Sequence, residues 1–299
     1  MNIIPPYLQQ GDTVAILCTA RKISKNEIEK ACKLLHAWGL QVKLGNTIGK
    51  EYHQFGGTDE QRANDFQQML NDKDVKAIWC ARGGYGTVRI IEKIDFSKIL
   101  QNPKWIIGFS DVTVLHSHLH NLGVASIHGI MPINVGTATQ MAEQSLYKTL
   151  FGQKNIYEIP SSKNNQLGKA TGVLVGGNLS ILYSLLGSAS AIDTDGKILF
   201  FEDLDEYLYH IDRMLMNLQR NDYFKNIKAI IVGGMTLMHD NAIAFGISIP
   251  EMLLDKICEM NIPVCFDFPA GHIDDNRTLL LGATVELEIL EERVTLKYV

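Results

Sequence analysis

The stretch Lys104–Asn121, KWIIGFSDVTVLHSHLHN, places a short apolar run directly before a segment with helical character. Lys104–Phe109 predicts a buried strand, and Asp111–Asn121 predicts a helix. Ser110 lies at the turn between them. A hydroxyl at this place faces free backbone N–H groups and the positive end of a helix dipole, which can stabilise an oxyanion. A serine there is more often an ordinary N-cap, and G-F-S-D is not the G-x-S-x-G nucleophile motif.

The segments before this stretch repeat the alternation of strand and helix. The Thr58-Asp-Glu-Gln61 run is a capping box, which predicts the start of a helix. Repeated β-α units predict a largely parallel sheet covered by helices. The strands are expected at Thr13–Cys18, Gln41–Leu44 and Val75–Ala81, and the helices from Ser24 to Trp38, from Thr58 to Leu70 and from a glycine turn through Ile94.

A polar stretch, Ser161–Lys169, interrupts the pattern and predicts a linker or an exposed loop. Beyond it the chain resumes with the apolar runs GVLVGG, KILFFED and KAIIVGG, separated by helical segments that begin near Asn178 and Glu206. The last two runs, ATVELEIL and RVTLKYV, alternate in polarity and predict a β-hairpin. We therefore expect two α/β domains, residues 1–160 and 161–299.

The composition excludes several classes of function. Apolar residues make up 46% of the 299 residues and charged residues 20%, as in a soluble globular protein. The net charge is −5 with Lys and Arg scattered, so a nucleic-acid partner is not expected. The sequence shows no secretory signal and no apolar run long enough to cross a bilayer, which predicts a cytoplasmic protein without a membrane partner. The five cysteines form no C-x-x-C and are expected to be reduced.

Three further motifs carry polar groups at predicted strand ends or in loops. The glycine turn Arg82–Gly86 follows a strand, and its N–H groups could face an oxyanion, although a tight turn explains it as well. Glu202 follows the buried run ILFF and could orient a histidine, or belong to a solvated acidic loop. His272 lies in a Pro/Gly loop and could serve as a general base, or be a surface residue.

Sites for metals and nucleotides are poorly supported. His116 and His120 would share a helix face, but the H-E-x-x-H pattern is absent, and no set of carboxylates or cysteines accompanies them, His118 or His128. The chain has no G-K-[ST], and the glycine turn does not match G-x-G-x-x-G. We therefore expect neither a metal nor an organic cofactor.

Taken together and in this order, the motifs resemble the LD-carboxypeptidase family over nearly the whole chain. The Gly-Phe-Ser-Asp run and the late Gly-His pair are fairly specific, whereas the glycine runs are less so. One departure is Cys18-Thr-Ala-Arg21, where relatives often carry a Pro-Ser pair. The matching segments are Gly11–Ala15, Cys80–Gly86, Ile107–Asp111, Val175–Leu179, Phe201–Asp203, Ile211–Arg213 and Pro269–His272.

The resemblance implies a role for each matching residue. Ser110 resembles the nucleophile, His272 the general base and Glu202 the residue that orients the histidine. The backbone N–H groups of Asp111 and Gly84 would form the oxyanion hole, with Gly83 as the other candidate for the second donor. The implied fold is a Rossmann-like N-terminal domain with a mostly parallel sheet and a C-terminal α/β domain with a mixed sheet. The active site would lie in the interdomain cleft.

The resemblance also implies a reaction. Ser110 would attack an L,D-amide and release the terminal D-alanine of a murein tetrapeptide during cell-wall recycling. The terminal carboxylate of such a substrate calls for an arginine, which the sequence leaves unidentified. Relatives suggest a homodimer.

Two other functions stay open from the sequence. A microcin-immunity-type peptidase would use the same triad on a peptidyl-nucleotide, and an aromatic loop that stacks on the nucleobase would favour it. A non-catalytic two-domain protein that binds a small molecule would also place a cleft between α/β domains. Reaction of Ser110 with a fluorophosphonate would separate an enzyme from a binding protein.

Overall fold

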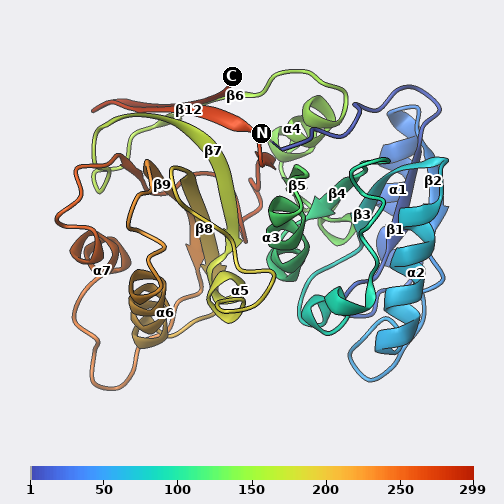
Figure 1. Ribbon diagram of the computed structural model, residues 1–299, viewed down its shortest axis with the longest axis horizontal. Coiled ribbons are helices and arrows are strands. Elements are labelled where there is room, and N and C mark those ends of the chain that lie inside the picture. The colour runs from blue at the N-terminus through green and yellow to red at the C-terminus, as the bar shows by residue number, and fades with distance from the viewer. Residues whose placement is uncertain (1) are drawn as a thin grey trace.

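The computed structural model describes residues 2–299, and their strands form two sheets (Figure 1). The first sheet has the strand order β11-β5-β4-β3-β1-β2. All of its pairings are parallel except that between β11 and β5. The bounds are β1 Thr13–Leu17, β2 Gln41–Leu44, β3 Val75–Cys80, β4 Trp105–Gly108, β5 Ser126–His128 and β11 Leu279–Leu281.

The second sheet is mixed, in the order β10-β9-β8-β7-β12-β13-β6. The strands β7 to β10 pair in parallel, and β12, β13 and β6 add antiparallel strands at the other edge. The bounds are β6 Ile156–Pro160, β7 Gly168–Asn178, β8 Ile198–Leu204, β9 Ala229–Thr236, β10 Val264–Cys265, β12 Thr284–Ile289 and β13 Arg293–Tyr298. The mostly parallel first sheet, the mixed second sheet and the terminal hairpin confirm the expected fold class.

Helices cover the sheets of both halves (Figure 1). The Thr58 side chain accepts a hydrogen bond from the Gln61 N–H at the start of α2, and the Thr58 N–H donates to Gln61 Oε1 at 3.0 Å, which completes the predicted capping box. The helix bounds are α1 Glu29–Ala37, α2 Asp59–Asn71, α3 Thr113–Asn121, α4 Gln140–Leu150, α5 Leu179–Ser184, α6 Leu208–Arg220 and α7 Ile249–Lys256.

One predicted helix is wrong. The segment after the glycine turn, expected to be helical through Ile94, forms two short 3₁₀ turns, Thr87–Arg89 and Ile91–Lys93. Two of the three residues in each turn are exposed, and four β-branched residues, Thr87, Val88, Ile90 and Ile91, follow one another closely, so little favours a longer α-helix. The helix expected from Ser24 begins as a 3₁₀ turn at Asn26, and α1 starts at Glu29.

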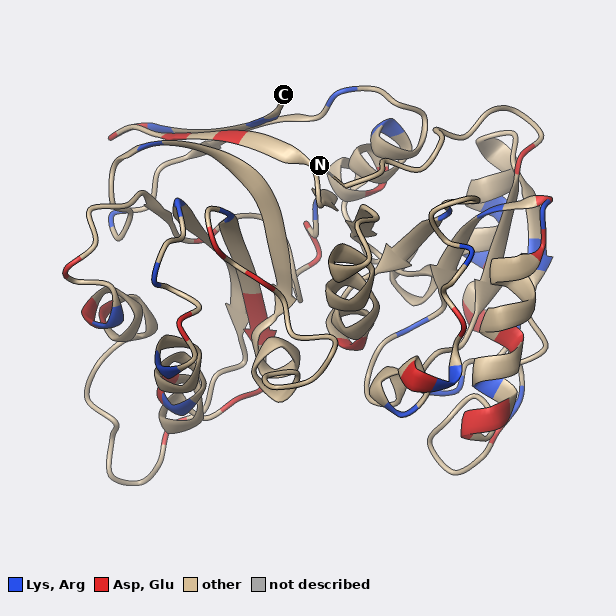
Figure 2. Cartoon of the chain, in the orientation of Figure 1, with Lys and Arg blue, Asp and Glu red and all other residues tan. Residues whose placement is uncertain are grey.

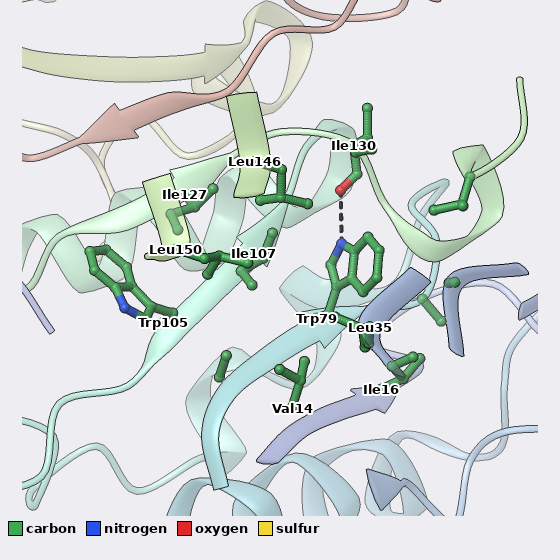
Figure 3. Close-up of a cluster of buried hydrophobic side chains, with 14 of the residues drawn as sticks. Val14, Ile16, Leu35, Trp79, Trp105, Ile107, Ile127, Ile130, Leu146 and Leu150 are labelled. Atoms are coloured by element: carbon green, nitrogen blue, oxygen red, sulfur yellow. Dashed lines mark hydrogen bonds between the residues drawn. The ribbon is translucent and has the colours of Figure 1, made fainter. Parts of the chain in front are cut away.

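One hydrophobic core of the first half lies between its sheet and helices α1 and α4, and a second packs against α2 and α3. Figure 3 shows the indole of Trp79, on β3, among Ile16, Leu35 and other buried side chains. Its Nε1 donates to the carbonyl of Ile130 at 2.8 Å, so the polar atom of this buried ring is paired.

Helix α3 is the element that joins the two halves. In Figure 1 it lies between the first sheet and β7, and its N-terminus contacts the end of β7. Thr113 Oγ1 accepts a hydrogen bond from the Asn178 N–H at 2.9 Å. A Cβ on Gly177 would lie 2.5 Å from the Thr113 hydroxyl, so only glycine permits this approach.

Strands also cross between the expected domains. β6, which ends at Pro160, belongs to the second sheet, where it pairs with β13. In the other direction, β11 from the second half extends the first sheet by pairing with β5. The division at residue 160 stays a prediction, but neither sheet is built from one half of the chain alone.

No helix in residues 2–299 is long and apolar enough to span a membrane. Figure 2 shows that acidic and basic residues are spread over both halves of the chain.

Candidate functional site

Ser110 lies in a sharp turn between β4 and α3. Only Phe109 separates it from the strand, and it opens a 3₁₀ turn, Ser110–Val112, that leads into the helix. Its φ is 62°, in the left-handed region that non-glycine residues rarely adopt. Such backbone strain is typical of functional sites. The cap position of this turn is occupied by Phe109 and that of α3 by Val112, and neither cap uses a side-chain hydrogen bond, so Ser110 is not an ordinary N-cap.

Glu202 lies on β8 at an irregularity of the sheet. The register with β9 shifts between Phe201 and Asp203, so that two successive carboxylates leave the regular alternation of the strand and both become buried. The side chain of Glu202 is completely buried. Its Oε1 accepts from Asn178 Nδ2 at 3.3 Å. A buried carboxylate is stable only with such partners, and its main partner is His272.

His272 is held by Glu202 through two hydrogen bonds. Its backbone N–H donates to Glu202 Oε2 at 3.1 Å, and its ring Nδ1 donates to the same oxygen at 2.6 Å. This leaves Nε2 as the ring nitrogen without a partner among the described residues. Burial lowers the pKa of His272, but the charge of Glu202 and its hydrogen bond outweigh burial and raise the pKa above the ordinary value.

Gly271 allows this loop to close on the strand. Its φ is 107°, and a Cβ at this position would lie 2.6 Å from both Cβ and Cγ of Glu202. The ring of His272 packs edge-on against Phe109, with 4.8 Å between the centroids. The residue before Ser110 therefore contacts the histidine, and the three predicted triad residues are brought to one place from three distant segments.

Asp203 is a second buried carboxylate beside Glu202. Its Oδ1 accepts from Asn178 Nδ2 and from the Leu204 N–H, both at 2.9 Å, and its Oδ2 accepts from the Ser180 N–H at 2.8 Å. Burial raises the pKa of Asp203 to about 7, and the charge of Glu202 contributes to the rise. Asp203 in turn contributes to the raised pKa of His272.

The glycine turn after β3 lies against the serine. A Cβ on Gly83 would lie 3.0 Å from Ser110 Oγ and 3.5 Å from the backbone nitrogen of Asp111, whereas a Cβ on Gly84 would meet Arg21. Gly84 has a φ of 110°, which favours glycine. The N–H groups of Gly83, Gly84 and Asp111 form no hydrogen bond with another described residue, so all three stay available as donors.

The side chain of Asp111 holds the turn that contains Ser110 against the segment after the glycine turn. It is buried, and its Oδ2 accepts from the Thr87 N–H at 2.8 Å. Burial raises the pKa of this carboxyl. The side chain of Asp111 therefore connects the serine turn to the segment after the glycine turn, and Asp111 is one of the residues that line the cleft.

These residues line one cleft of about 600 Å³ between the two halves. Ser110, Asp111, Gly83 and Gly84 come from the first half, whereas Asp203 and His272 come from the second. Glu202 lies behind His272 and is not exposed to the cleft. The cleft also receives Arg21, Arg82, Asp205, Glu206 and the apolar side chains of Met131, Ile133 and Ile181.

The histidines of α3 do not gather at a common point. His116 bonds to Ser126 Oγ and to the Gly108 carbonyl, His118 to Ser190 Oγ and His120 to Asn2. His128 is fully buried among Phe109, Phe200 and His116, and burial keeps its pKa well below the ordinary value. Among residues 2–299, no group of three or more His, Cys, Asp or Glu is arranged to hold a metal ion.

Sequence reasoning named the segments that contain Asp203 and Gly271 but gave neither residue a role. The only available signals were the doubled acid in FFED and the glycine before the histidine. A pattern cannot show that both acids of a strand are buried, because that depends on the bulge against β9.

Comparison with known proteins gives consistent matches. Residues 14–129 match the model of the LD-carboxypeptidase N-terminal domain, and residues 171–287 match that of the LD-carboxypeptidase C-terminal domain. The chain is 36% identical to a probable murein peptide carboxypeptidase of Bacillus subtilis, over 99% of this chain and 95% of the relative. It is 26% identical to the microcin C7 self-immunity protein of Escherichia coli, over 97% of this chain and 94% of that protein.

The fold has a similar solved structure. The muramoyltetrapeptide carboxypeptidase of Oxalobacter formigenes superposes with a TM-score of 0.88 at 27% identity, covering 96% of this chain and 98% of that one.

Proposed function

The chain belongs to the LD-carboxypeptidase family, and from this premise we propose that it is a serine carboxypeptidase that releases the terminal D-amino acid from murein peptides. The observation that carries the proposal is the buried Glu202–His272 pair, which lies in the same cleft as a serine with a φ of 62°. A base that is oriented by a carboxylate and placed beside a strained hydroxyl is the arrangement of a nucleophilic triad.

The proposed reaction begins at Ser110. Its Oγ attacks the scissile carbonyl, and His272 Nε2 takes the hydroxyl proton because Nδ1 is occupied by Glu202. The tetrahedral intermediate collapses when His272 gives this proton to the amine of the departing D-amino acid. Water, deprotonated by His272, then hydrolyses the acyl-enzyme and restores Ser110.

The negative charge of the intermediate falls on the carbonyl oxygen. We assign its donors to the N–H of Asp111 and to the Gly83–Gly84 turn. Gly84 is the donor expected from the sequence, and the closeness of Gly83 to Ser110 Oγ supports the turn as a whole. Preorganised N–H groups at this place stabilise the transition state without reorganisation.

The substrate is proposed from the relatives. The Bacillus subtilis protein is named for murein peptides and the Oxalobacter formigenes protein for muramoyltetrapeptides. We propose the tetrapeptide L-Ala-γ-D-Glu-meso-diaminopimelate-D-Ala as the substrate, cut before D-alanine. Recycling of such peptides takes place in the cytoplasm, and the cytoplasmic location and the homodimer both stay predictions.

The immunity-type alternative lacks a supporting contact. Among the described residues of the cleft, Phe109 is the single aromatic side chain, and it packs against His272 instead of offering an open ring face. A nucleobase would need such a face to stack on. The peptide substrate is therefore the better fit.

The test is mass spectrometry of the tetrapeptide after incubation with wild type and with Ser110→Ala. Wild type should release D-alanine, and Ser110→Ala should lose activity by about 10⁴- to 10⁶-fold. The His272→Ala variant should lose a similar amount, and the double variant no more than the worse single one, because triad members act as a unit. Full activity of Ser110→Ala would refute the assigned nucleophile, and no release by wild type would refute the substrate.

A further inference from the structure

Apart from the buried carboxyl group of Asp111, the charged side chains on the two walls of the cleft are of opposite sign. The basic side chains that line it are Arg21 and Arg82, which follow β1 and β3 in the first half. The wall from the second half carries Asp203, Asp205 and Glu206. A ligand with a free carboxylate is repelled by the acidic wall and attracted to the basic one.

Arg21 is positioned by the glycine turn. A Cβ on Gly84 would lie 2.7 Å from its Cγ, 2.6 Å from its Cδ and 2.9 Å from its Nε, so the side chain lies directly over this residue. The backbone of Arg21 is held by a bridge to Phe55. The preceding residue of the same turn, Gly83, lies against Ser110. Arg21 and the nucleophile therefore lie next to adjacent residues of one turn.

The two arginines differ in their partners. Arg82 Nη1 donates to the Lys22 carbonyl at 3.3 Å and lies 4.0 Å from Glu27 Oε1. The guanidinium of Arg21 forms no hydrogen bond or ion pair with another residue of the described chain, so all five of its N–H donors remain available for a ligand. Arg82 also holds the loop that contains Arg21, through its bond to Lys22.

These contacts, together with the proposed carboxypeptidase function on which the inference rests, suggest what Arg21 binds. We propose that Arg21, with Arg82 in support, binds the terminal carboxylate of the departing D-amino acid. The fork of a guanidinium pairs with a carboxylate through two parallel hydrogen bonds. Recognition of this group would make the enzyme an exopeptidase, because a peptide that continues beyond the cleaved bond has no carboxylate at that position.

The test combines variants of Arg21 with two substrates. One is the tetrapeptide with its free terminal carboxylate, and the other is the same peptide ending in D-alaninamide. Arg21→Ala should lower kcat/KM for the free acid by about 10- to 100-fold, the range for loss of a charged hydrogen bond. For the amide, Arg21→Ala and wild type should agree within about twofold, because the charge that Arg21 recognises is absent.

Matched variants separate charge from shape. Arg21→Lys keeps the charge without the fork and should recover part of the lost activity on the acid. Arg82→Ala should show a smaller loss that is again confined to the acid. Arg220→Ala, at the exposed C-terminal end of α6, is the control and should behave as wild type with both substrates.

A binding measurement removes any dependence on turnover of the amide. In the Ser110→Ala background, adding Arg21→Ala should raise the Kd of the free acid and leave that of the amide unchanged. An equal loss of affinity for acid and amide would overturn the inference, because Arg21 would then bind another carboxylate or hold the fold. Unchanged affinity for both peptides would also overturn it. If wild type cleaves neither peptide before its last residue, the proposed function fails and the inference falls with it.

Discussion

At the scale of single residues, Gly271 explains why the histidine loop can reach Glu202. The space where its side chain would begin is occupied by Cβ and Cγ of Glu202, 2.6 Å away. Any larger residue would move the loop, and with it the 2.6 Å hydrogen bond between His272 Nδ1 and Glu202 Oε2. The glycine is therefore a positioning residue for the base.

Gly271→Ala should lower kcat by more than about 100-fold, because a small displacement of a catalytic group is costly. It should also lower the free energy of unfolding by about 1–3 kcal/mol, through steric overlap and a φ of 107°. Gly187→Ala is the control: its φ is 78°, but its Cβ would meet open space. If both variants lost the same stability and kept full activity, contact with Glu202 would not be the reason for the glycine.

Glu202→Gln tests the orienting carboxylate. We expect a loss in kcat of about 10⁴-fold, because an amide cannot stabilise the histidine tautomer and the imidazolium as a carboxylate does. Steady-state kinetics on the tetrapeptide would measure it, with circular dichroism to show that the variant is folded. A loss of less than about tenfold would place Glu202 outside the catalytic unit.

Asp203→Asn tests the electrostatics of the base by its pH dependence. His272 acts in its neutral form, so kcat/KM falls as pH drops below its pKa. Asp203 contributes to raising that pKa, so its neutralisation should lower the pKa and move the acid limb of the profile to lower pH. The surface variant Asp195→Asn should leave the limb in place. A shift of the Asp203→Asn limb to higher pH would contradict this assignment.

At the scale of secondary-structure elements, the junction between α3 and β7 links the two walls of the cleft. Ser110 precedes α3, and Asn178, which contacts both Glu202 and Asp203, ends β7. The hydrogen bond from Asn178 N to Thr113 Oγ1 links these two points directly. Movement at this junction would separate the nucleophile from its base.

Thr113→Val removes the acceptor at nearly constant volume and leaves the buried Asn178 N–H unpaired. We expect a loss in the free energy of unfolding of about 1–3 kcal/mol, measured by urea denaturation, together with a lower kcat. Thr171→Val, on the exposed part of β7, should change stability by no more than about 0.5 kcal/mol. Equal stability of the two variants would show that the junction bond is not stabilising.

At the scale of the whole molecule, the exchange of strands ties the two halves together. β6 belongs by sequence to the first half but completes the second sheet, and β11 does the reverse. The loop at residues 161–167 connects β6 to β7; Lys163 and Leu167 in it are exposed, and its other residues are half-buried. Cutting the chain there breaks one covalent link without breaking either strand pairing.

A protease site introduced at Lys163–Asn165 should therefore be cleaved without separating the fragments. After cleavage, both fragments should elute together in size-exclusion chromatography and retain activity on the tetrapeptide. Fragments that separate under native conditions would show that the halves are independent domains, joined only by the linker.

The sequence by itself determined the alternation of strands and helices, the turn that contains Ser110 and the order of the motifs, because these depend on local periodicity and on residues that are near in the chain. It did not determine the exchange of β6 and β11, since this follows from pairing between distant segments. Only the tertiary structure placed Glu202 against His272, buried Asp203 beside them and put Arg21 over the glycine turn. Hydrogen bonds and burial between segments far apart in the chain decide these contacts, 70 residues apart for Glu202 and His272, and no local pattern records them.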